Sequence, residues 1–173
     1  MVAKPDSPRK FGISMLIIAW LMIFILLGLF FKEVLDQQTN PNTQPLSQGN
    51  QQLVEVVLLP NRQHHYIVSG LVNQQPVTFL LDTGATDVVV PETVARRLGL
   101  NKGATQFATT ANGTVTVYNT VIDQLGIGDI KLQQLRASIN PAMDGEVILL
   151  GMSALKQVEF TQSNGALILR QQR

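Results

Sequence analysis

The chain has 173 residues, of which 13 are basic and 12 acidic, and a formal net charge of +1. This balance, with no run of basic residues, gives no electrostatic basis for nucleic-acid binding. Because the chain contains no cysteine, it can form neither a disulfide nor a cysteine-based zinc site. The length predicts one ordinary folded domain with an appendage.

The first predicted element is an uncharged apolar run, Phe11 to Phe31. As a helix it is long enough to cross a hydrocarbon core of roughly 30 Å. A cleaved signal peptide is the alternative, but its apolar region is usually ~7–15 residues long and ends at a small-residue cleavage site. The following KEVLDQQ has no such site. Residues 1–36 are therefore predicted to be a cytoplasmic N-terminus and a membrane anchor, with the span at 11–31.

The charges beside this run predict its orientation. Three basic residues precede the span and one directly follows it: Lys4, Arg9 and Lys10, then Lys32. The positive-inside rule places the N-terminus in the cytoplasm and the rest of the chain across the membrane. Residues 37–52 carry no charge and one large apolar residue, Leu46, so we expect them to form a flexible tether.

Residues 53–173 have the pattern of a single β-rich domain. Short stretches rich in β-branched residues alternate with turn signals such as Asn112-Gly113 and Asn164-Gly165. The expected strands lie at residues 53–59, 66–72, 77–81, 87–90, 114–122, 125–132, 137–139, 147–150, 158–160 and 166–169. Two short helices are expected at residues 91–100 and 151–157. Many short strands with few helices indicate a closed or nearly closed all-β structure.

One carboxylate ends an apolar strand in the stretch FLLDTGATDVVV, residues 79–90. A lone aspartate such as Asp82 costs stability there unless it is hydrogen-bonded or functional. Gly84 permits a tight turn and the close approach of a backbone or a ligand, and the hydroxyl of Thr83 can form local hydrogen bonds. The combination predicts a carboxylate held rigidly where a strand leaves the sheet. A strand that simply ends in a turn sequence is the alternative.

The stretch resembles the motif of the retropepsin-like aspartic proteases (clan AA), especially their membrane-anchored bacterial members. Two apolar residues followed by Asp-Thr-Gly-Ala form the family motif, which residues 80–85 match. A second family element, two apolar residues and a glycine before a short helix, is matched by LLG at residues 149–151. Between them, FATTANGTVTVY resembles the family's flap hairpin. Thr86 and Met152 stand where retroviral members often carry Asp and Arg.

The resemblance covers residues 53–173 and implies a single-lobed retropepsin-like β barrel preceded by one transmembrane helix. It implies an aspartic endopeptidase that hydrolyses an extended peptide or protein substrate without metal or cofactor. Its location would be the bacterial inner membrane, with the protease domain in the periplasm. The implied catalytic residues are Asp82, Thr83 and Gly84, and the implied substrate-binding residues are Ala85, Asp87, Asn112 and Gly113.

The chain contains one Asp-Thr-Gly triplet. Hydrolysis without a metal or a covalent intermediate needs two close carboxylates that share one proton. One such residue per chain therefore implies a homodimer with the site on its two-fold axis. By resemblance, the two Thr83 side chains would join the paired loops.

Two other functions stay open: a catalytically silent peptide-binding domain, and a structural anchor that only dimerises. The intact triplet favours the enzyme, because a pure binding domain needs no carboxylate pair. His64 and His65 are expected to be adjacent in a strand, so that they point to opposite faces and cannot both serve one metal ion. Asp144-Gly145-Glu146 is typical of a polar turn. Asn112-Gly113-Thr114 fits an N-glycosylation acceptor and equally a hairpin turn.

Overall fold

The structure is a computed structural model that describes residues 8–50, 52–110 and 113–172. The chain divides into two compact units, Met1–Gln37 and Gln38–Arg173.

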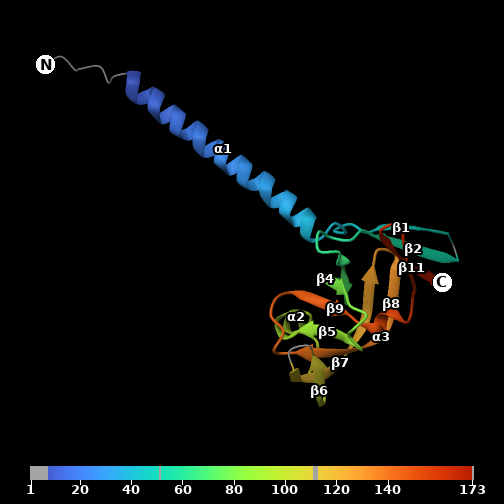
Figure 1. Cartoon of the computed structure of the whole chain (residues 1–173). Coiled ribbons are helices and arrows are strands. Elements are labelled where there is room, and N and C mark those ends of the chain that lie inside the picture. The colour runs from blue at the N-terminus through green and yellow to red at the C-terminus, as the bar shows by residue number, and fades with distance from the viewer. Residues whose placement is uncertain (1–7, 51, 111–112, 173) are drawn as a thin grey trace. The chain divides into compact units, whose positions relative to one another are not determined.

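The first unit consists largely of the long helix α1, Pro8–Thr39 (Figure 1). By length and composition, its stretch Gly12–Thr39 is able to cross a membrane. The large apolar side chains between Ile13 and Leu35 are exposed on all sides of the helix. A helix that is apolar all round is stable in lipid or inside a large core. The N-terminal helix is thus a candidate membrane span.

The second unit is mostly β structure. Its strands are β1 (Leu46–Gly49), β2 (Leu53–Leu58), β3 (Ile67–Val72), β4 (Gln75–Leu81), β5 (Val88–Pro91), β6 (Thr105–Thr110), β7 (Gly113–Ile127), β8 (Ile130–Asn140), β9 (Val147–Leu150), β10 (Glu159–Ser163) and β11 (Ala166–Gln172). Its short helices are α2 (Glu92–Arg97) and α3 (Met152–Leu155).

The larger sheet closes on itself. Its strand order is β3-β4-β9-β5-β8-β7-β6, and β3 pairs back to β7 at Leu71–Gly126 and Val72–Leu125. Closure removes exposed sheet edges, and the β6–β7 hairpin extends beyond the ring. A second sheet, β1-β2-β11-β10, lies at the end of this unit opposite β6 (Figure 1). The closed all-β structure expected from the sequence is confirmed.

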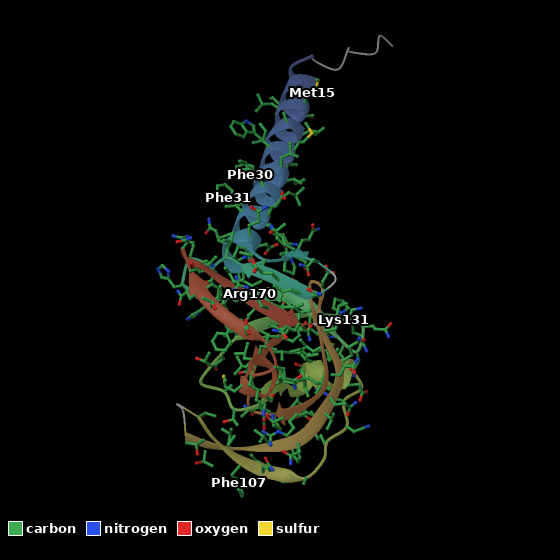
Figure 2. The ribbon with its side chains drawn as sticks, turned by 90° about the vertical axis from the view of Figure 1, so that its right-hand side faces the viewer. Met15, Phe30, Phe31, Phe107, Lys131 and Arg170 are labelled. Carbon is green, nitrogen blue, oxygen red and sulfur yellow. The ribbon has the colours of Figure 1, made fainter. Side chains whose placement is uncertain are left out.

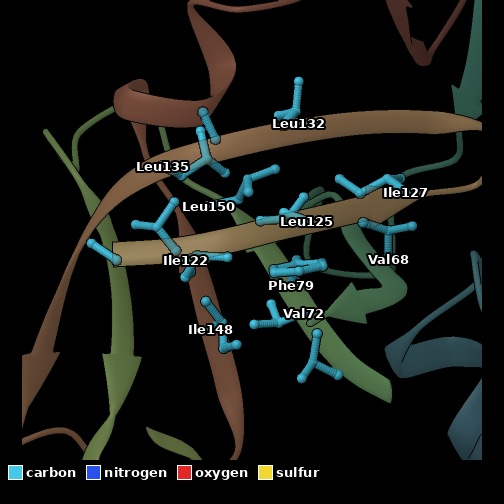
Figure 3. Packing of buried hydrophobic residues seen from close by; sticks show 14 of the residues in the cluster. Val68, Val72, Phe79, Ile122, Leu125, Ile127, Leu132, Leu135, Ile148 and Leu150 are labelled. Atoms are coloured by element: carbon cyan, nitrogen blue, oxygen red, sulfur yellow. The ribbon is translucent and has the colours of Figure 1, made fainter. Parts of the chain in front are cut away.

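The barrel core fixes the strand that precedes Asp82. On β4, Val77 and Phe79 are 6% and 0% exposed, because alternate strand residues face the core. Figure 3 shows Phe79 among Val72, Leu125 and other buried side chains. Burying one such aromatic side chain stabilises the fold by roughly 1.5–3 kcal/mol. The end of β4 therefore has a fixed position.

Part of the segment that composition predicts to be a flexible tether is ordered. β1 pairs antiparallel with β2, and Asn42 is 4% exposed. Its Nδ2 donates to the carbonyl oxygens of Leu59 (2.8 Å) and Ile67 (2.7 Å), and its Oδ1 accepts from the N–H of Leu59 (2.7 Å). Here a buried amide side chain orders the segment by hydrogen bonds to backbone groups. A prediction based on apolar content does not detect order of this kind. The domain boundaries as a whole stay a prediction.

The two histidines lie in a turn before β3, so the expectation that they are part of a strand is wrong. His64 has a positive φ of 61°. The Oδ1 atom of Asn61 accepts hydrogen bonds from the backbone N–H groups of Gln63 (2.9 Å) and His65 (3.0 Å). This side-chain cap favours a turn over an extended strand.

Candidate active site

Asp82 directly follows β4, at the start of a loop. Its backbone N–H donates to the carbonyl oxygen of Leu150 on β9 (3.2 Å). Its Oδ1 accepts from the backbone N–H of Gly84 (2.9 Å), and the side chain is half-buried. A Cβ at residue 84 would lie 3.2 Å from the same oxygen, so glycine leaves the carboxylate unobstructed. The carboxylate is thus held at a fixed place where the strand ends.

The LLG segment supports this loop from the neighbouring strand. β9 runs parallel to β4, with Leu150 opposite Leu81. A Cβ on Gly151 would collide with the carbonyl oxygen of Asp87 and lie 2.7 Å from that of Ala85. The N–H of Met152 donates to the Ala85 carbonyl oxygen (2.8 Å). Only glycine allows the two backbones to approach this closely.

A buried serine ties the loop to two strands. Ser153 is 4% exposed. Its Oγ accepts from the N–H of Val88 (3.0 Å) and donates to the carbonyl oxygen of Arg136 (2.8 Å). Its own N–H donates to the carbonyl oxygen of Thr86 (2.9 Å). Three backbone groups from the loop, β5 and β8 are therefore satisfied by one residue.

The second carboxylate of the loop belongs to Asp87. Its Oδ1 is buried and lies 3.3 Å from Nη2 of Arg136, which makes an ion pair without the alignment of a hydrogen bond. The Arg136 side chain is 69% exposed, so the solvent screens this pair and its contribution is at most about 1 kcal/mol. The contact directs Asp87 toward β8.

A groove of about 650 Å³ separates the loop from the β6–β7 hairpin. Its lining comes from the loop, from the hairpin and from β5, β8 and β9: Asp82, Gly84–Asp87, Val89, Gln106–Thr110, Val117, Ser138, Asn140 and Leu149. Phe107 of β6 is 79% exposed, and Figure 2 shows it projecting from the end of the unit. The groove combines apolar walls with a carboxylate, as binding clefts commonly do.

Four of the predicted site residues line this groove: Asp82, Gly84, Ala85 and Asp87. Thr83 is exposed and lines a second pocket, which Asp82 shares. Gly113 begins β7 with a φ of 111° and is not among the described residues that line the groove. Asn112 lies outside the described residues.

Sequence reasoning missed Ser153 and Arg136. Ser153 stands two positions after the LLG segment and carries no pattern of its own. Within the described ranges, no group of three or more His, Cys, Asp or Glu residues is placed to hold a metal ion.

Comparison with known proteins agrees with this geometry. Residues 68–157 match the family described as "gag-polyprotein putative aspartyl protease". This match covers more than half of the chain and includes both the Asp82 loop and the LLG segment. The chain belongs to the retropepsin-like aspartic protease family.

The chain is 29% identical over 119 residues to the "Uncharacterized protein in cobV 5'region" of Sinorhizobium sp., a match that covers 67% of this chain and 50% of the relative. It is 27% identical over 106 residues to an uncharacterized protein of Rickettsia prowazekii (strain Madrid E), over 60% of this chain and 45% of the relative. The retropepsin-like chain thus spans about half the length of these relatives.

The fold of the chain is similar to the crystal structure of a retropepsin-like aspartic protease from Rickettsia conorii, with a TM-score of 0.56 and 23% identity. The alignment covers 75% of this chain and 96% of that chain. At this level of identity the likeness concerns the fold.

Proposed function

We propose that this chain is a membrane-anchored aspartic endopeptidase whose active site forms between two copies of the chain. The observation that carries the proposal is the position of Asp82, fixed by the N–H of Gly84 and lining a groove of about 650 Å³. A groove of this size accommodates several residues of an extended peptide. Membership of an aspartyl protease family supports the same chemistry.

Two Asp82 carboxylates close together cannot both ionise, so they share one proton. The ionised carboxylate takes a proton from a water molecule as the water oxygen attacks the peptide carbonyl carbon. The protonated carboxylate gives its proton to the carbonyl oxygen. When the tetrahedral intermediate collapses, the carboxyl that took the proton from water gives it to the nitrogen, and the C–N bond breaks. The other carboxylate takes a proton back from a hydroxyl of the intermediate, which restores the shared proton. No covalent enzyme intermediate forms.

The other residues of the loop have supporting roles in this proposal. Gly84 holds the Asp82 carboxylate through its N–H, and the exposed Thr83 joins the loop of the second copy. Ala85 and Asp87 contact the substrate in the groove that they line. The hairpin that contains Gly113 and Asn112 closes over an extended peptide, which pairs with it as an added strand.

The proposal places α1 in a bacterial inner membrane, with the N-terminus in the cytoplasm and the protease domain, residues 53–173, in the periplasm. The apolar helix supports an anchor by length and composition. The excess of basic residues before the span supports the orientation.

The deciding experiment replaces Asp82 by asparagine and measures cleavage of a peptide library at several pH values. Asparagine is nearly isosteric but can neither act as the base nor share the proton. We expect Asp82→Asn to abolish hydrolysis with an unchanged melting profile. Asp129→Asn, at an exposed turn far along the chain, is the matched control and should keep full activity.

Near-normal turnover by Asp82→Asn would contradict the role of this carboxylate. If the wild-type chain binds library peptides without cleaving any at any pH, the peptide-binding alternative replaces the enzyme. Binding is followed by fluorescence anisotropy of labelled peptides on the same samples.

A further inference from the structure

Three side chains of β8 lie on the face of the sheet that lines the groove. Alternate residues of a strand point to the same face, and Ala137 and Ile139 belong to the buried core. The opposite face therefore carries Arg136, Ser138 and Asn140. Ser138 and Asn140 line the groove. Arg136 continues their line along β8 and lies next to the lining of the groove.

The pairing of β8 with β5 places Arg136 beside a carboxylate of the groove. The two strands run parallel, with Val88 next to Ala137. Asp87, directly before Val88, is therefore next to Arg136, and its Oδ1 lies 3.3 Å from Nη2 of Arg136. Asp87 itself lines the groove. The guanidinium of Arg136 is thus in contact with the wall of the groove.

The guanidinium of Arg136 keeps most of its donors for another partner. Its side chain is 69% exposed, and within the described ranges it makes this one ion pair, without the alignment of a hydrogen bond. A guanidinium has five N–H donors in a planar fork that matches the two oxygens of a carboxylate. The described lining of the groove holds two acidic residues, Asp82 and Asp87, and no basic one. Arg136 therefore supplies a positive charge that the lining itself lacks.

We propose that Arg136 makes the groove select peptides with an acidic side chain, whose carboxylate accepts hydrogen bonds from the guanidinium. Such charge-assisted bonds are among the strongest that a side chain forms. The inference deepens the proposed function and rests on it. Each copy in the proposed dimer supplies one Arg136, so the preferred acidic positions lie on both sides of the cleaved bond. Arg136 contacts Asp87, so it acts on recognition of the substrate rather than on the reacting atoms.

The alternative is a structural role, in which Arg136 only holds Asp87 in place. Solvent screens an ion pair with this exposure, so the pair holds Asp87 weakly. Loss of a structural role changes the cleavage of all peptides alike, whereas loss of recognition changes the ratio between acidic and neutral peptides. That ratio is therefore the deciding quantity.

The experiment uses the full-length chain in detergent and a library peptide that it cleaves. Glu, Gln or Lys is placed in turn at each position of this peptide, and kcat/KM is measured for every member of the series. At one position on each side of the cleaved bond, we expect wild type to prefer Glu over Gln by about 3- to 5-fold, the scale of one exposed ion pair. The preference should weaken at high salt, because salt screens the charges.

Variants of Arg136 test whether its guanidinium is the cause. Arg136→Gln should abolish the preference for Glu, and Arg136→Glu should reverse it in favour of Lys. Arg136→Lys keeps the charge but loses the planar fork, so it should keep only part of the preference. If Arg136→Glu fails to fold, Arg136→Gln decides the matter, because it adds no negative charge beside Asp87.

Lys131→Glu is the matched control for Arg136→Glu. It makes the same change of charge at an exposed residue of the same strand. Figure 2 shows Lys131 well away from Phe107, which lines the groove. The control should therefore keep the wild-type preference for Glu.

Cleavage without a preference for Glu in wild type would overturn the inference and leave the proposed function intact. So would a preference that Arg136→Gln leaves unchanged, or a variant that loses activity on all peptides alike. If wild type cleaves none of the peptides, fluorescence anisotropy of the labelled series replaces the kinetics. A preference for Glu in binding that Arg136→Gln removes would then support recognition by Arg136 and contradict the proposed function, and its absence would overturn both.

Discussion

Hydrogen bonds of the backbone and of one hydroxyl group, rather than charge, hold the loop that carries Asp82. The pair between Asp87 and the largely exposed Arg136 is screened by solvent. Ser153, in contrast, is buried and bonds to Val88 N–H and Arg136 carbonyl in the barrel wall. Removing such a hydroxyl takes one hydrogen-bond partner from each of the two backbone groups, and a buried group left unsatisfied costs roughly 1–3 kcal/mol.

We therefore expect Ser153→Ala to lower the free energy of unfolding by roughly 1–3 kcal/mol. Peptide cleavage should fall as well, mainly in kcat, because the loop that aligns Asp82 loses its support. Urea denaturation and steady-state kinetics measure the two effects. Lys156→Ala, at an exposed position directly after α3, is the control and should change neither. A Ser153→Ala chain as stable as wild type would contradict the bonding described above.

Among single residues, the sequence predicted those site residues that belong to short local motifs. Asp82, Gly84 and the LLG segment each depend on a few neighbouring residues, and the structure places them in contact. The bonds of Ser153 span 65 residues to Val88 and 17 to Arg136. Only the strand order of the barrel brings these groups together, and no local pattern encodes it.

Within the larger sheet, β6 pairs with one strand only, β7. The residues of β6 are almost all exposed, and β6 lies at the end of the strand order.

The sequence predicts separate strands at 114–122, 125–132 and 137–139, whereas the structure has two long continuous strands, β7 and β8. It also missed β1, since four residues in a polar segment carry no alternating pattern. Pairing with neighbouring strands keeps these segments extended, although the intrinsic strand propensity of their residues does not predict it.

At the hairpin, we expect Gly113→Val to lower kcat/KM several-fold while changing the melting temperature little. Gly113 has a φ of 111°, which a β-branched residue adopts only with strain. The strain would alter the segment that is proposed to close over the substrate, so activity should fall. Because this segment makes few buried contacts, the melting temperature should change little. Gly145→Val is the matched control, because Gly145 also has a positive φ of 89° and open space around it. Equal kinetics for wild type and Gly113→Val would place the closing element elsewhere.

The whole molecule combines an apolar helix with a domain that offers one Asp-Thr-Gly loop. In the proposed function, confinement to a membrane raises the effective concentration of each chain for its copy. Dimerisation would then limit activity less in the membrane than in dilute detergent. Because each chain supplies one Asp82, assembly of the proposed dimer and completion of its site would be one event.

This coupling predicts the result of mixing. When wild-type and Asp82→Asn chains are combined in equal amounts and allowed to exchange, random pairing leaves only about one quarter of the dimers with two carboxylates. Activity per total dimer should therefore fall to about one quarter, rather than the half expected for independent chains, because a dimer with one carboxylate and one amide cannot share the proton. The control mixes wild-type chains with Asp129→Asn chains, whose dimers keep both Asp82 carboxylates and should stay fully active. An activity that follows the wild-type fraction linearly with the Asp82→Asn chain, under conditions where exchange is demonstrated, would show that each chain works alone.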